Sequence, residues 1–528
     1  MPVNNGVVLF GLDSGNFDII FKFLDSLPNF RLIVERGIIN DLISTIPPLT
    51  PPAWSAIITG KNPGKTDVYD WIHYDRRQRK VEISSFNLIK GLKIWDILAF
   101  KKLKSCIVNL PLTYPAKPIN GVMVSGIPGH VGSSSKITYP RDLIHKLNEL
   151  VDGYEIIPYV DLRVENLEKE FFYEFKRILK KRFEVFKFLY DYDCWHFFMP
   201  VIFVLDSVHH YYWHHLDPTH PNYDPKLSQK YVGYVKYLYR MIDSFLGWLI
   251  KRSKEDHFDI IMVSDHGMGP LRGNFLINKY LFKKGYLKLC LTENMDKKTN
   301  FTDLVKSTYT RITMKVKQAR KIVELLTNLL PMSFFEKFTV RGADKSKAWL
   351  VLSNLDTNAK DNVFALGEFG QIYIDSLNSY QTLLNSIISD IKNDFARMKI
   401  NVDVFIGKQI YNGKYISNAP DIIIMIEENL ILPDISLIDL ETHYLFSSNK
   451  LKAAHRLNGI FMAYGENINN LLIREHIRPF SVYDITPTIL SLFNIPLTKE
   501  FDGKPLLTKK VKWISNYGIY KVLTKLRR

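Results

Sequence analysis

Four segments that are far apart in the sequence place carboxylates and histidines next to apolar runs. They are VLFGLDSG with Asp13, FVLDSVHH with Asp206 and His210, IMVSDHGM with Asp265 and His266, and AAHRLNGI with His455. Carboxylate oxygen and imidazole nitrogen together suit Zn²⁺, Mn²⁺ or Fe²⁺, and no thiolate is needed. Each pair alone is a weak signal, because Asp-His-Gly is often a turn and histidines near aromatic residues often pack in a core. The four segments together predict a metal site.

A hydroxyl that such metals could activate lies in TPPAWSAIITG, which runs from Thr50 to Gly60. Thr50 is a favoured N-cap residue, Pro51 is a favoured first helical residue, and Gly60 is a helix stop. The N-terminus of a helix presents free N–H groups and positive dipole, which suit a phosphoryl group. On local sequence alone Thr50 is only a helix cap. Threonine becomes a nucleophile when a base or a metal activates it, so the metal candidates favour a chemical role.

The end of the same stretch, TGKNPGKT, is one residue short of the phosphate-binding pattern G-x-x-x-x-G-K-[ST]. Thr59 stands where the first glycine of that pattern is expected. A loop of that kind follows a strand and opens a helix, whereas here a helix-like segment comes before it. We therefore interpret this part as the exit from a short helix. Lys61 and Lys65 could attract phosphate, but surface charge at the helix end is the favoured interpretation.

The elements that must position these residues are continuous apolar strands alternating with helical segments. Examples of the strands are GVVLFGLD, FFMPVIFVLD and DIIMVSD, each ending in an aspartate, and GIFMAYG. Segments such as PRDLIHKLNELV and EKEFFYEFKRILKKRFEVFKFLYD have a helical pattern. This alternation predicts an α/β protein with a buried, mostly parallel sheet. Ligands of such sheets collect at the carboxyl ends of the strands, where the aspartates stand.

Two polar breaks, at 291–300 and 353–362, suggest how the chain is divided. We expect residues 1–284 and 440–508 to form the core and residues 285–439 to form an inserted cap or subdomain. Residues 509–528 form a basic tail. It could contact an anionic membrane surface, although a surface helix or a disordered tail without a function is the favoured interpretation.

Composition narrows the class of protein further. The chain has 528 residues and a formal net charge of +16, which favours anionic partners but does not specify a fold. The three cysteines, Cys106, Cys194 and Cys290, form no C-x-x-C pair, which argues against a disulfide scaffold and a cysteine zinc site. The N-terminus lacks a basic signal-peptide region, and the apolar runs are too short to span a bilayer. We expect a soluble cytoplasmic protein without a nucleic-acid-binding module.

In their order, the metal-candidate segments resemble the alkaline phosphatase superfamily, most closely its type I phosphodiesterase and nucleotide pyrophosphatase branch. The matching motifs are GLD, T-x-P-x-x-x-x-x-x-T-G from Thr50, D-x-x-x-H from Asp206, SDHGM, HRLNGIFMAYG and the closing VYDITPTILSLFNIPLTKEFDGKPL. The resemblance covers roughly residues 5–285 and 450–508. It implies an alkaline-phosphatase-like core in which helices flank a mostly parallel central sheet, with an inserted cap or subdomain.

The resemblance implies two divalent metal ions, with Zn²⁺ preferred and Mn²⁺ or Fe²⁺ as alternatives. The implied ligands are Asp206, His210 and His455 for one ion, and Asp13, Asp265 and His266 with the Thr50 oxygen for the other. Such a pair stabilises the attacking and leaving oxygens of an in-line displacement. It further implies that Thr50 attacks phosphorus and forms a phospho-threonine, which water then hydrolyses. The Thr50 amide and its neighbours would help to hold the phosphoryl oxygens.

This chain departs from the branch at several positions that affect substrate preference. Ala53 stands where asparagine is frequent, Thr66-Asp67 replaces a His-Gly pair, and Trp71 stands where an asparagine usually contacts a phosphoryl oxygen. None of these changes removes an implied metal ligand. His209, His214 and His215 flank His210 without matching its spacing, so we interpret them as packing or pocket-rim residues.

The expected function is a metal-dependent hydrolase of phosphoesters, a phosphodiesterase or nucleotide pyrophosphatase acting on an anionic small molecule. Within the superfamily, a phosphomonoesterase or another phosphoryl or sulfuryl transferase is the alternative. Thr50 and the lack of a C-x-P-S-R segment disfavour the superfamily's usual monoesterases and sulfatases, respectively. An inactive binding protein on the same fold is the alternative from a different class. The natural substrate, the metal identity and the oligomeric state stay open.

Overall fold

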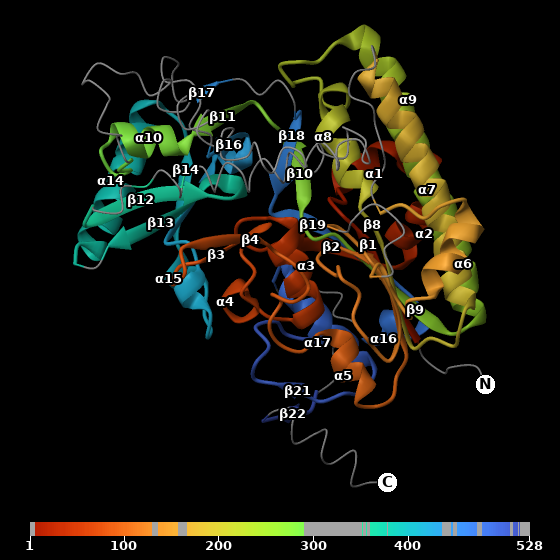
Figure 1. Ribbon diagram of the computed structural model, residues 1–528. Coiled ribbons are helices and arrows are strands. Elements are labelled where there is room, and N and C mark those ends of the chain that lie inside the picture. Colours follow the sequence, from red (N-terminus) through yellow and green to blue (C-terminus); the bar gives the residue numbers. More distant parts are fainter. Residues whose placement is uncertain are drawn as a thin grey trace, which may run out of the picture.

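The chain forms two lobes, which Figure 1 shows side by side. The computed structural model describes residues 6–128, 136–156, 166–289, 351, 355, 359–376, 378–435, 445–446, 451–471, 478–506, 511–515 and 517. The larger lobe contains long helices packed on a central sheet. The smaller lobe contains a second sheet with its own helices.

The central sheet has nine strands among the described residues. Their order is β20 (Phe480–Ser481), β2 (Ile38–Ile43), β19 (Asn458–Tyr464), β9 (Phe258–Val263), β1 (Gly6–Leu12), β8 (Phe197–Ile202), β5 (Ser105–Leu110), β6 (Gly121–Ser125) and β7 (Thr138–Tyr139). Neighbouring strands are parallel except where β19 or β7 takes part. The predicted α/β class with a mostly parallel central sheet is therefore confirmed.

The apolar composition of the central strands follows from their burial. Every residue of β1, β5 and β8 is buried, so both faces of these strands need apolar side chains. Phe10 of β1 packs edge-on against Phe245, and the neighbouring Gly11 lies against Trp54. Because successive side chains of a strand point to opposite faces, the helices carrying Phe245 and Trp54 cover opposite faces of the sheet.

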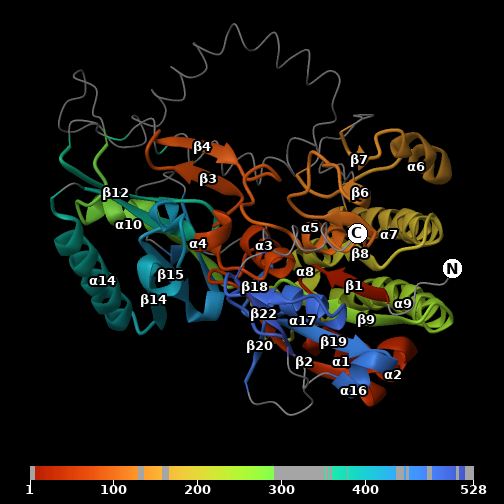
Figure 2. The same cartoon turned by 90° about the horizontal axis from the view of Figure 1, so that it is seen from below.

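The helices of the larger lobe include the one that carries Thr50 and Trp54. They are α1 (Phe17–Phe23), α2 (Pro28–Arg36), α3 (Thr50–Thr59), α4 (Pro63–Thr66), α5 (Ile94–Ala99), α6 (Leu143–Val151), α7 (Leu167–Asp191), α8 (Val204–Leu216), α9 (Pro225–Glu255), α16 (Glu466–Leu471) and α17 (Ile485–Leu492). Figure 2 shows α6, α7 and α9 together on one side of the lobe and α3 nearer to its centre. None of the helices in the described ranges is both long and apolar enough to cross a membrane.

The second sheet belongs to the smaller lobe. It contains β12 (Asp361–Leu366), β13 (Gln371–Ser376), β15 (Ile422–Ile426), β16 (Ile431–Asp434), β11 (Gly273–Leu276) and β17 (Leu445–Phe446), while β14 (Val402–Ile406) pairs with β15. Its helices include α10 (Ile277–Lys283), α14 (Tyr380–Arg397) and α15 (Gly407–Ile410). β11 and β17 lie in parts of the chain that the sequence-based boundaries assign to the core. Those boundaries stay a prediction.

A hairpin of the larger lobe joins the two lobes. Its strands β3 (Ile72–Asp75) and β4 (Lys80–Ile83) contribute apolar side chains to the core of the smaller lobe. Arg76 in the turn forms an ion pair of 2.8 Å with Asp421. Figure 2 shows this hairpin lying next to the second sheet.

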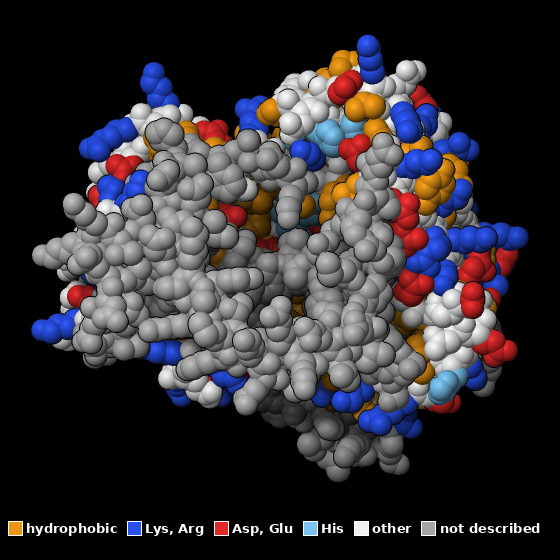
Figure 3. Space-filling model, turned by 45° about the horizontal axis from the view of Figure 1, so that its top comes forward, with side chains coloured by type: hydrophobic (Ala, Val, Ile, Leu, Met, Phe, Trp, Pro, Cys, Tyr) orange, Lys and Arg blue, Asp and Glu red, His pale blue; other side chains and the backbone are white. Residues whose placement is uncertain are grey.

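The described surface is rich in lysine and arginine, as Figure 3 shows on the helical side of the molecule. Most of the basic tail from residue 509 lies outside the described residues. Within its described part, β22 (Trp513–Ile514) pairs in parallel with β21 (Leu497–Thr498), so this portion is a short strand and not a helix. A role of the tail at a membrane surface stays a prediction.

Candidate active site

Two adjacent parallel strands, β1 and β9, deliver three of the candidate ligands. Gly11 of β1 pairs with Val263 of β9 near the carboxyl ends of both strands. Asp13 follows β1 directly, and Asp265 and His266 follow β9 after one residue. All three side chains are fully buried. The carboxyl ends of neighbouring parallel strands therefore place these ligands together, as the sequence predicted.

Asp206 and His210 are positioned by a helix and not by a strand end. β8 ends at Ile202, and Asp206 lies in the first turn of α8. The prediction that the strand runs to Asp206 is therefore wrong, because the apolar run continues into the buried start of α8. In a helix, residues four apart lie on one face. His210 Nε2 is accordingly 3.4 Å from Asp206 Oδ1.

His455 comes from a short antiparallel pair that crosses the site. It lies in β18 (Ala453–Arg456), which pairs with β10 (Gly267–Pro270) so that His455 is opposite Met268. This pairing brings the His455 ring onto the His266 ring, with 3.7 Å between their centroids. His455 precedes β19, as predicted.

The first predicted ligand group is assembled with metal-like spacing. His455 Nε2 lies 3.2 Å from Asp206 Oδ1 and 3.2 Å from His210 Nε2. Ligand atoms about 2.05 Å from a tetrahedral zinc ion are about 3.3 Å apart. Asp206, His266 and His455 also form a group with this kind of spacing, so His266 lies between the two predicted centres.

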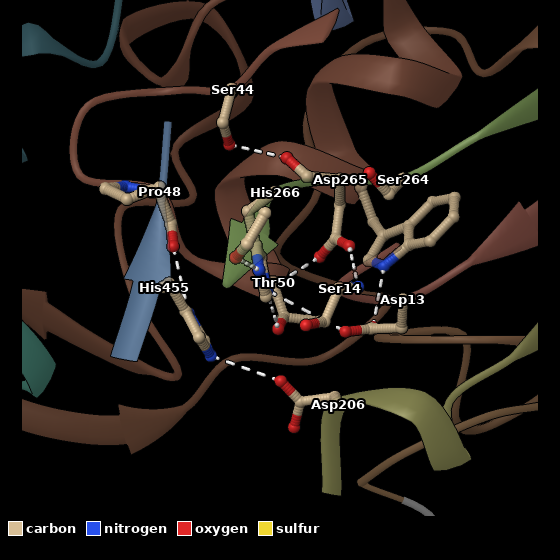
Figure 4. Close-up of polar contacts among 12 residues, drawn as sticks. Asp13, Ser14, Ser44, Pro48, Thr50, Asp206, Ser264, Asp265, His266 and His455 are labelled. Atoms are coloured by element: carbon tan, nitrogen blue, oxygen red, sulfur yellow. Dashed lines mark hydrogen bonds and ion pairs between the residues drawn. The ribbon is translucent and has the colours of Figure 1, made fainter. Parts of the chain in front are cut away.

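The second predicted group surrounds Thr50, as Figure 4 shows. His266 Nε2 lies 3.3 Å from Asp265 Oδ2 and 3.7 Å from Asp13 Oδ1. The Thr50 hydroxyl oxygen lies 3.3 Å from the same nitrogen. Asp13, Asp265 and His266 are thus arranged as a candidate metal site, with the hydroxyl beside it.

The histidines of both groups share one hydrogen-bonding arrangement. Their Nδ1 atoms lie against backbone carbonyl oxygens: His210 to Ala453 at 2.9 Å, His455 to Pro48 at 3.0 Å, and His266 to Gly267 at 3.0 Å. In a neutral histidine whose Nδ1–H donates to a carbonyl oxygen, Nε2 carries a lone pair. Metal-binding histidines use this arrangement to fix their tautomer and ring orientation.

A cation fits the space between these ligands. The buried oxygens Asp206 Oδ1 and Asp265 Oδ2 accept no hydrogen bond from the described residues. Each faces a histidine Nε2 that presents a lone pair. Two acceptors at 3.2–3.3 Å repel each other unless a metal ion or a proton lies between them. The donor set of these groups therefore fits divalent transition metals.

Burial and charge shift the titration of these groups in different directions. Burial raises the pKa of Asp265 well above its usual range, and the Asp206 charge adds to this shift. Burial and the nearby His455 lower the pKa of His266. Burial alone would raise the pKa of Asp206, but when His210 and His455 are protonated their charge and hydrogen bonds hold this pKa well below its ordinary value.

The helix that carries Thr50 begins one residue earlier than predicted. Leu49 is the N-cap residue, and Thr50 is the first residue of α3. The prediction of Thr50 as N-cap is therefore wrong, since its hydroxyl faces His266 and makes no capping hydrogen bond. Gly60 ends the helix in the left-handed conformation with φ 67°, as the sequence predicted.

Two residues that sequence patterns did not indicate, Trp54 and Ser14, hold the candidate ligands in place. Trp54, one turn after Thr50, donates its Nε1–H to Asp13 Oδ2 at 3.0 Å. The Ser14 N–H donates to Asp265 Oδ1 at 3.3 Å. The spacing of four between Thr50 and Trp54 was visible in the sequence and places both on one helix face.

The remaining histidine and lysine candidates have structural partners. His209 is buried, with Nδ1 3.0 Å from Ser14 Oγ and Nε2 2.8 Å from the Tyr239 hydroxyl, which confirms a packing role. Lys61 pairs with Glu500, and Lys65 pairs with Asp502 at 2.8 Å. Lys61 is buried, so the prediction of surface charge is wrong for Lys61, whereas Lys65 is partly exposed.

The fold and the buried aspartate–histidine site define a hydrolase that acts on phosphoester bonds, of a metal-dependent kind. The chain belongs to the type I phosphodiesterase/nucleotide pyrophosphatase family, whose model matches residues 7–429. The match includes every predicted site residue except His455. The resemblance read from the sequence is thereby confirmed.

Solved structures to which this chain is similar include ectonucleotide pyrophosphatase/phosphodiesterase 5 from human and mouse. The human protein is 14% identical, with 96% of this chain and 100% of that chain covered and a TM-score of 0.49. An inactive variant of the murine protein in complex with AMP is 12% identical, with 98% and 100% covered and a TM-score of 0.49. A comparison with curated proteins gives no significant match.

Proposed function

We propose that this protein hydrolyses a phosphodiester or pyrophosphate bond of an anionic small molecule, with the Thr50 hydroxyl as nucleophile. The observation that carries this proposal is the position of the hydroxyl. It lies 3.3 Å from His266 Nε2, beside two groups of buried aspartates and histidines. A threonine hydroxyl in that position is next to the charges that can activate it.

Two divalent ions, with zinc preferred, are part of the proposal. Asp206, His210 and His455 would hold one ion, and Asp13, Asp265 and His266 would hold the other together with the Thr50 oxygen. Bound metals of this kind lower the pKa of an attacking hydroxyl and stabilise the attacking and leaving oxygens. Aspartate and histidine ligands at near-tetrahedral spacing favour zinc, while Mn²⁺ and Fe²⁺ stay alternatives.

The chain's own groups orient the reaction. Thr50 Oγ would attack phosphorus in line and form a phospho-threonine, with loss of the leaving group, and water would then hydrolyse this ester. At the start of α3, Pro51 and Pro52 carry no N–H. The Thr50 amide, rather than its neighbours, is therefore the backbone donor at this helix end for a phosphoryl oxygen.

The test compares a chromogenic phosphodiester with the matching monoester on zinc-loaded protein. We expect the diester to be the better substrate. Thr50→Ala should reduce kcat by about 10³-fold or more, because loss of a nucleophile removes the covalent route. Thr50→Ser should keep measurable activity. His145→Ala, an exposed residue of α6, serves as the control.

Each result has a defined meaning. Without turnover of either ester and without bound transition metal, the proposed activity is wrong. Full activity of the Thr50→Ala variant would show that Thr50 is not the nucleophile, but it would not affect the assignment of the chain to the family. Faster hydrolysis of the monoester would favour the monoesterase alternative.

A panel of nucleotide diesters, lipid phosphodiesters and monoesters then identifies the leaving group. Acid-quenched turnover with mass spectrometry should find one phosphoryl group on the Thr50 peptide of the wild type.

A further inference from the structure

A third group of potential ligands, Glu168, His214 and His215, lies outside the two predicted metal centres. Glu168 is near the start of α7, and both histidines are in the last turn of α8. Glu168 Oε1 lies 3.2 Å from His214 Nε2 and 2.9 Å from His215 Nε2. The three ligand atoms all lie within 4.8 Å of one another.

The two distances in this group, 2.9 and 3.2 Å, are equal to or slightly shorter than those in the predicted catalytic centres. Neighbouring ligand atoms there are 3.2–3.7 Å apart, and a tetrahedral zinc ion requires about 3.3 Å. Both histidines direct Nε2 at one carboxylate oxygen. His215 Nδ1 lies 3.3 Å from Ser228 Oγ, a partner that can accept its proton and leave the Nε2 lone pair facing Glu168.

Two further contacts show that the group is held in place. The Tyr212 hydroxyl donates to the backbone carbonyl of Glu168, which fixes the start of α7 against α8. The His215 ring stacks on Tyr231, with 4.5 Å between their centroids. His214 is also buried, and its Nδ1 has no hydrogen-bond partner among the described residues. The ligands are thus positioned before any ion binds.

The electrostatics at this group favour a cation. The Glu168 carboxylate faces both histidine Nε2 atoms and would supply negative charge to an ion held between them. Lys452 lies close enough to interact with this charge, but its ammonium group donates to Asn222 at 3.3 Å. The Glu168 side chain is 30% exposed, which leaves a path for solvent to complete the coordination.

We propose that Glu168, His214 and His215 form a third binding site for a divalent transition metal of the zinc type. Three protein ligands and a solvent position satisfy tetrahedral coordination. The ion would connect the start of α7 to the end of α8. Since α8 also carries Asp206 and His210, the site would anchor the helix that supplies ligands to the proposed active site.

The decisive experiment removes the proposed catalytic ions. The variant Asp206→Asn/Asp265→Asn is stripped with chelator and reloaded with Zn²⁺, and bound metal is counted after gel filtration. We expect about one ion per chain to be retained, and a higher unfolding temperature with Zn²⁺ than without it. Adding Glu168→Gln should abolish both effects, although glutamine keeps the size of the side chain and a hydrogen-bond acceptor.

A second comparison works in the wild-type background. Glu168→Gln and His215→Gln should each bind one ion fewer than the wild type and still hydrolyse the phosphodiester, whereas the exposed His145→Ala should bind the same number. This comparison alone decides the question if the double variant fails to fold. An unchanged ion count in both variants would overturn the proposal and leave the group as a hydrogen-bonded clamp. Because the readout is metal content, it is independent of whether the proposed hydrolysis is correct.

Discussion

Trp54 determines the orientation of a predicted metal ligand without binding the metal itself. Its Nε1–H donates to Asp13 Oδ2, which leaves Oδ1 directed at His266. The ring fits against β1 only because residue 11 is glycine. A Cβ atom there would lie 2.6 Å from the Trp54 ring. Gly11 and Trp54 together therefore set the position of Asp13.

We predict that Trp54→Phe weakens zinc binding. Phenylalanine keeps most of the buried ring but removes the donor to Asp13, and loss of such a supporting hydrogen bond typically costs 10–100-fold in metal affinity or activity. Zinc affinity measured by chelator competition should fall by about that factor, with a similar loss of diester hydrolysis. Trp95→Phe, a buried tryptophan of α5, is the matched control. Equal zinc affinities of the two variants would contradict the role of Trp54.

The candidate ligands could be selected from the sequence because their residue types and their order carry the signal, and the structure brings them together. The supporting residues could not. The Ser14 amide reaches Asp265, 251 positions away, and Trp54 reaches Asp13 across the interface between α3 and β1. Such contacts depend on how the helices and strands pack. Serine and tryptophan also occur elsewhere in the chain, so residue type alone does not show which of them support the site.

At the scale of the elements, α8 shows where a continuous apolar pattern misleads. The run FFMPVIFVL appears to be one strand, but β8 ends at Ile202 and α8 begins at Val204. Both parts are buried, so hydrophobicity does not separate them. The i, i+4 spacing of Asp206 and His210 is the feature that fits the helix. The α/β class with a mostly parallel sheet was predictable from the sequence, whereas the boundary between β8 and α8 could be located only in the folded structure.

α7 offers a prediction on pH and stability. Arg177 forms a bidentate ion pair with Glu155, at 2.6 and 2.7 Å, and Lys181 adds a contact of 3.1 Å. Burial alone would raise the pKa of Glu155, but these cations lower it from the ordinary 4.5. A depressed pKa means that the ion pair stabilises the fold above pH 4.5. This stability is lost as the pH falls through the lower pKa of the folded state.

Glu155→Gln should therefore lower the free energy of unfolding by about 0.5–1 kcal/mol at neutral pH, a value reduced for partial solvent exposure. The difference from the wild type should shrink as the pH falls from about 5 toward 3. Urea unfolding across this range measures it. Glu184→Gln, which removes a more exposed pair with Lys187 at 3.5 Å, should change stability less. A pH-independent difference would show that the charge of Glu155 is not its cause.

At the scale of the whole molecule, the smaller lobe contacts the proposed active site. Asn429 donates its side-chain N–H to the backbone carbonyl of His455 at 2.9 Å. The buried Tyr411 hydroxyl donates to the carbonyl of Ile46, in the loop that leads to Thr50. In the same loop, Pro48 holds His455 Nδ1. The sequence indicated added material here, but not that this material contacts the loop before Thr50 and the strand that carries His455.

This arrangement predicts the effect of Tyr411→Phe. The change leaves the Ile46 carbonyl without its buried donor, which should cost about 1–3 kcal/mol of stability. It should also lower kcat for the phosphodiester, because the loop positions both Thr50 and the carbonyl that orients His455. Tyr286→Phe removes another hydroxyl of the smaller lobe, one that donates to Asp390 at 2.8 Å, and should leave kcat unchanged. If both variants had wild-type kcat at a temperature where they are fully folded, the lobe would stabilise the chain without positioning the nucleophile.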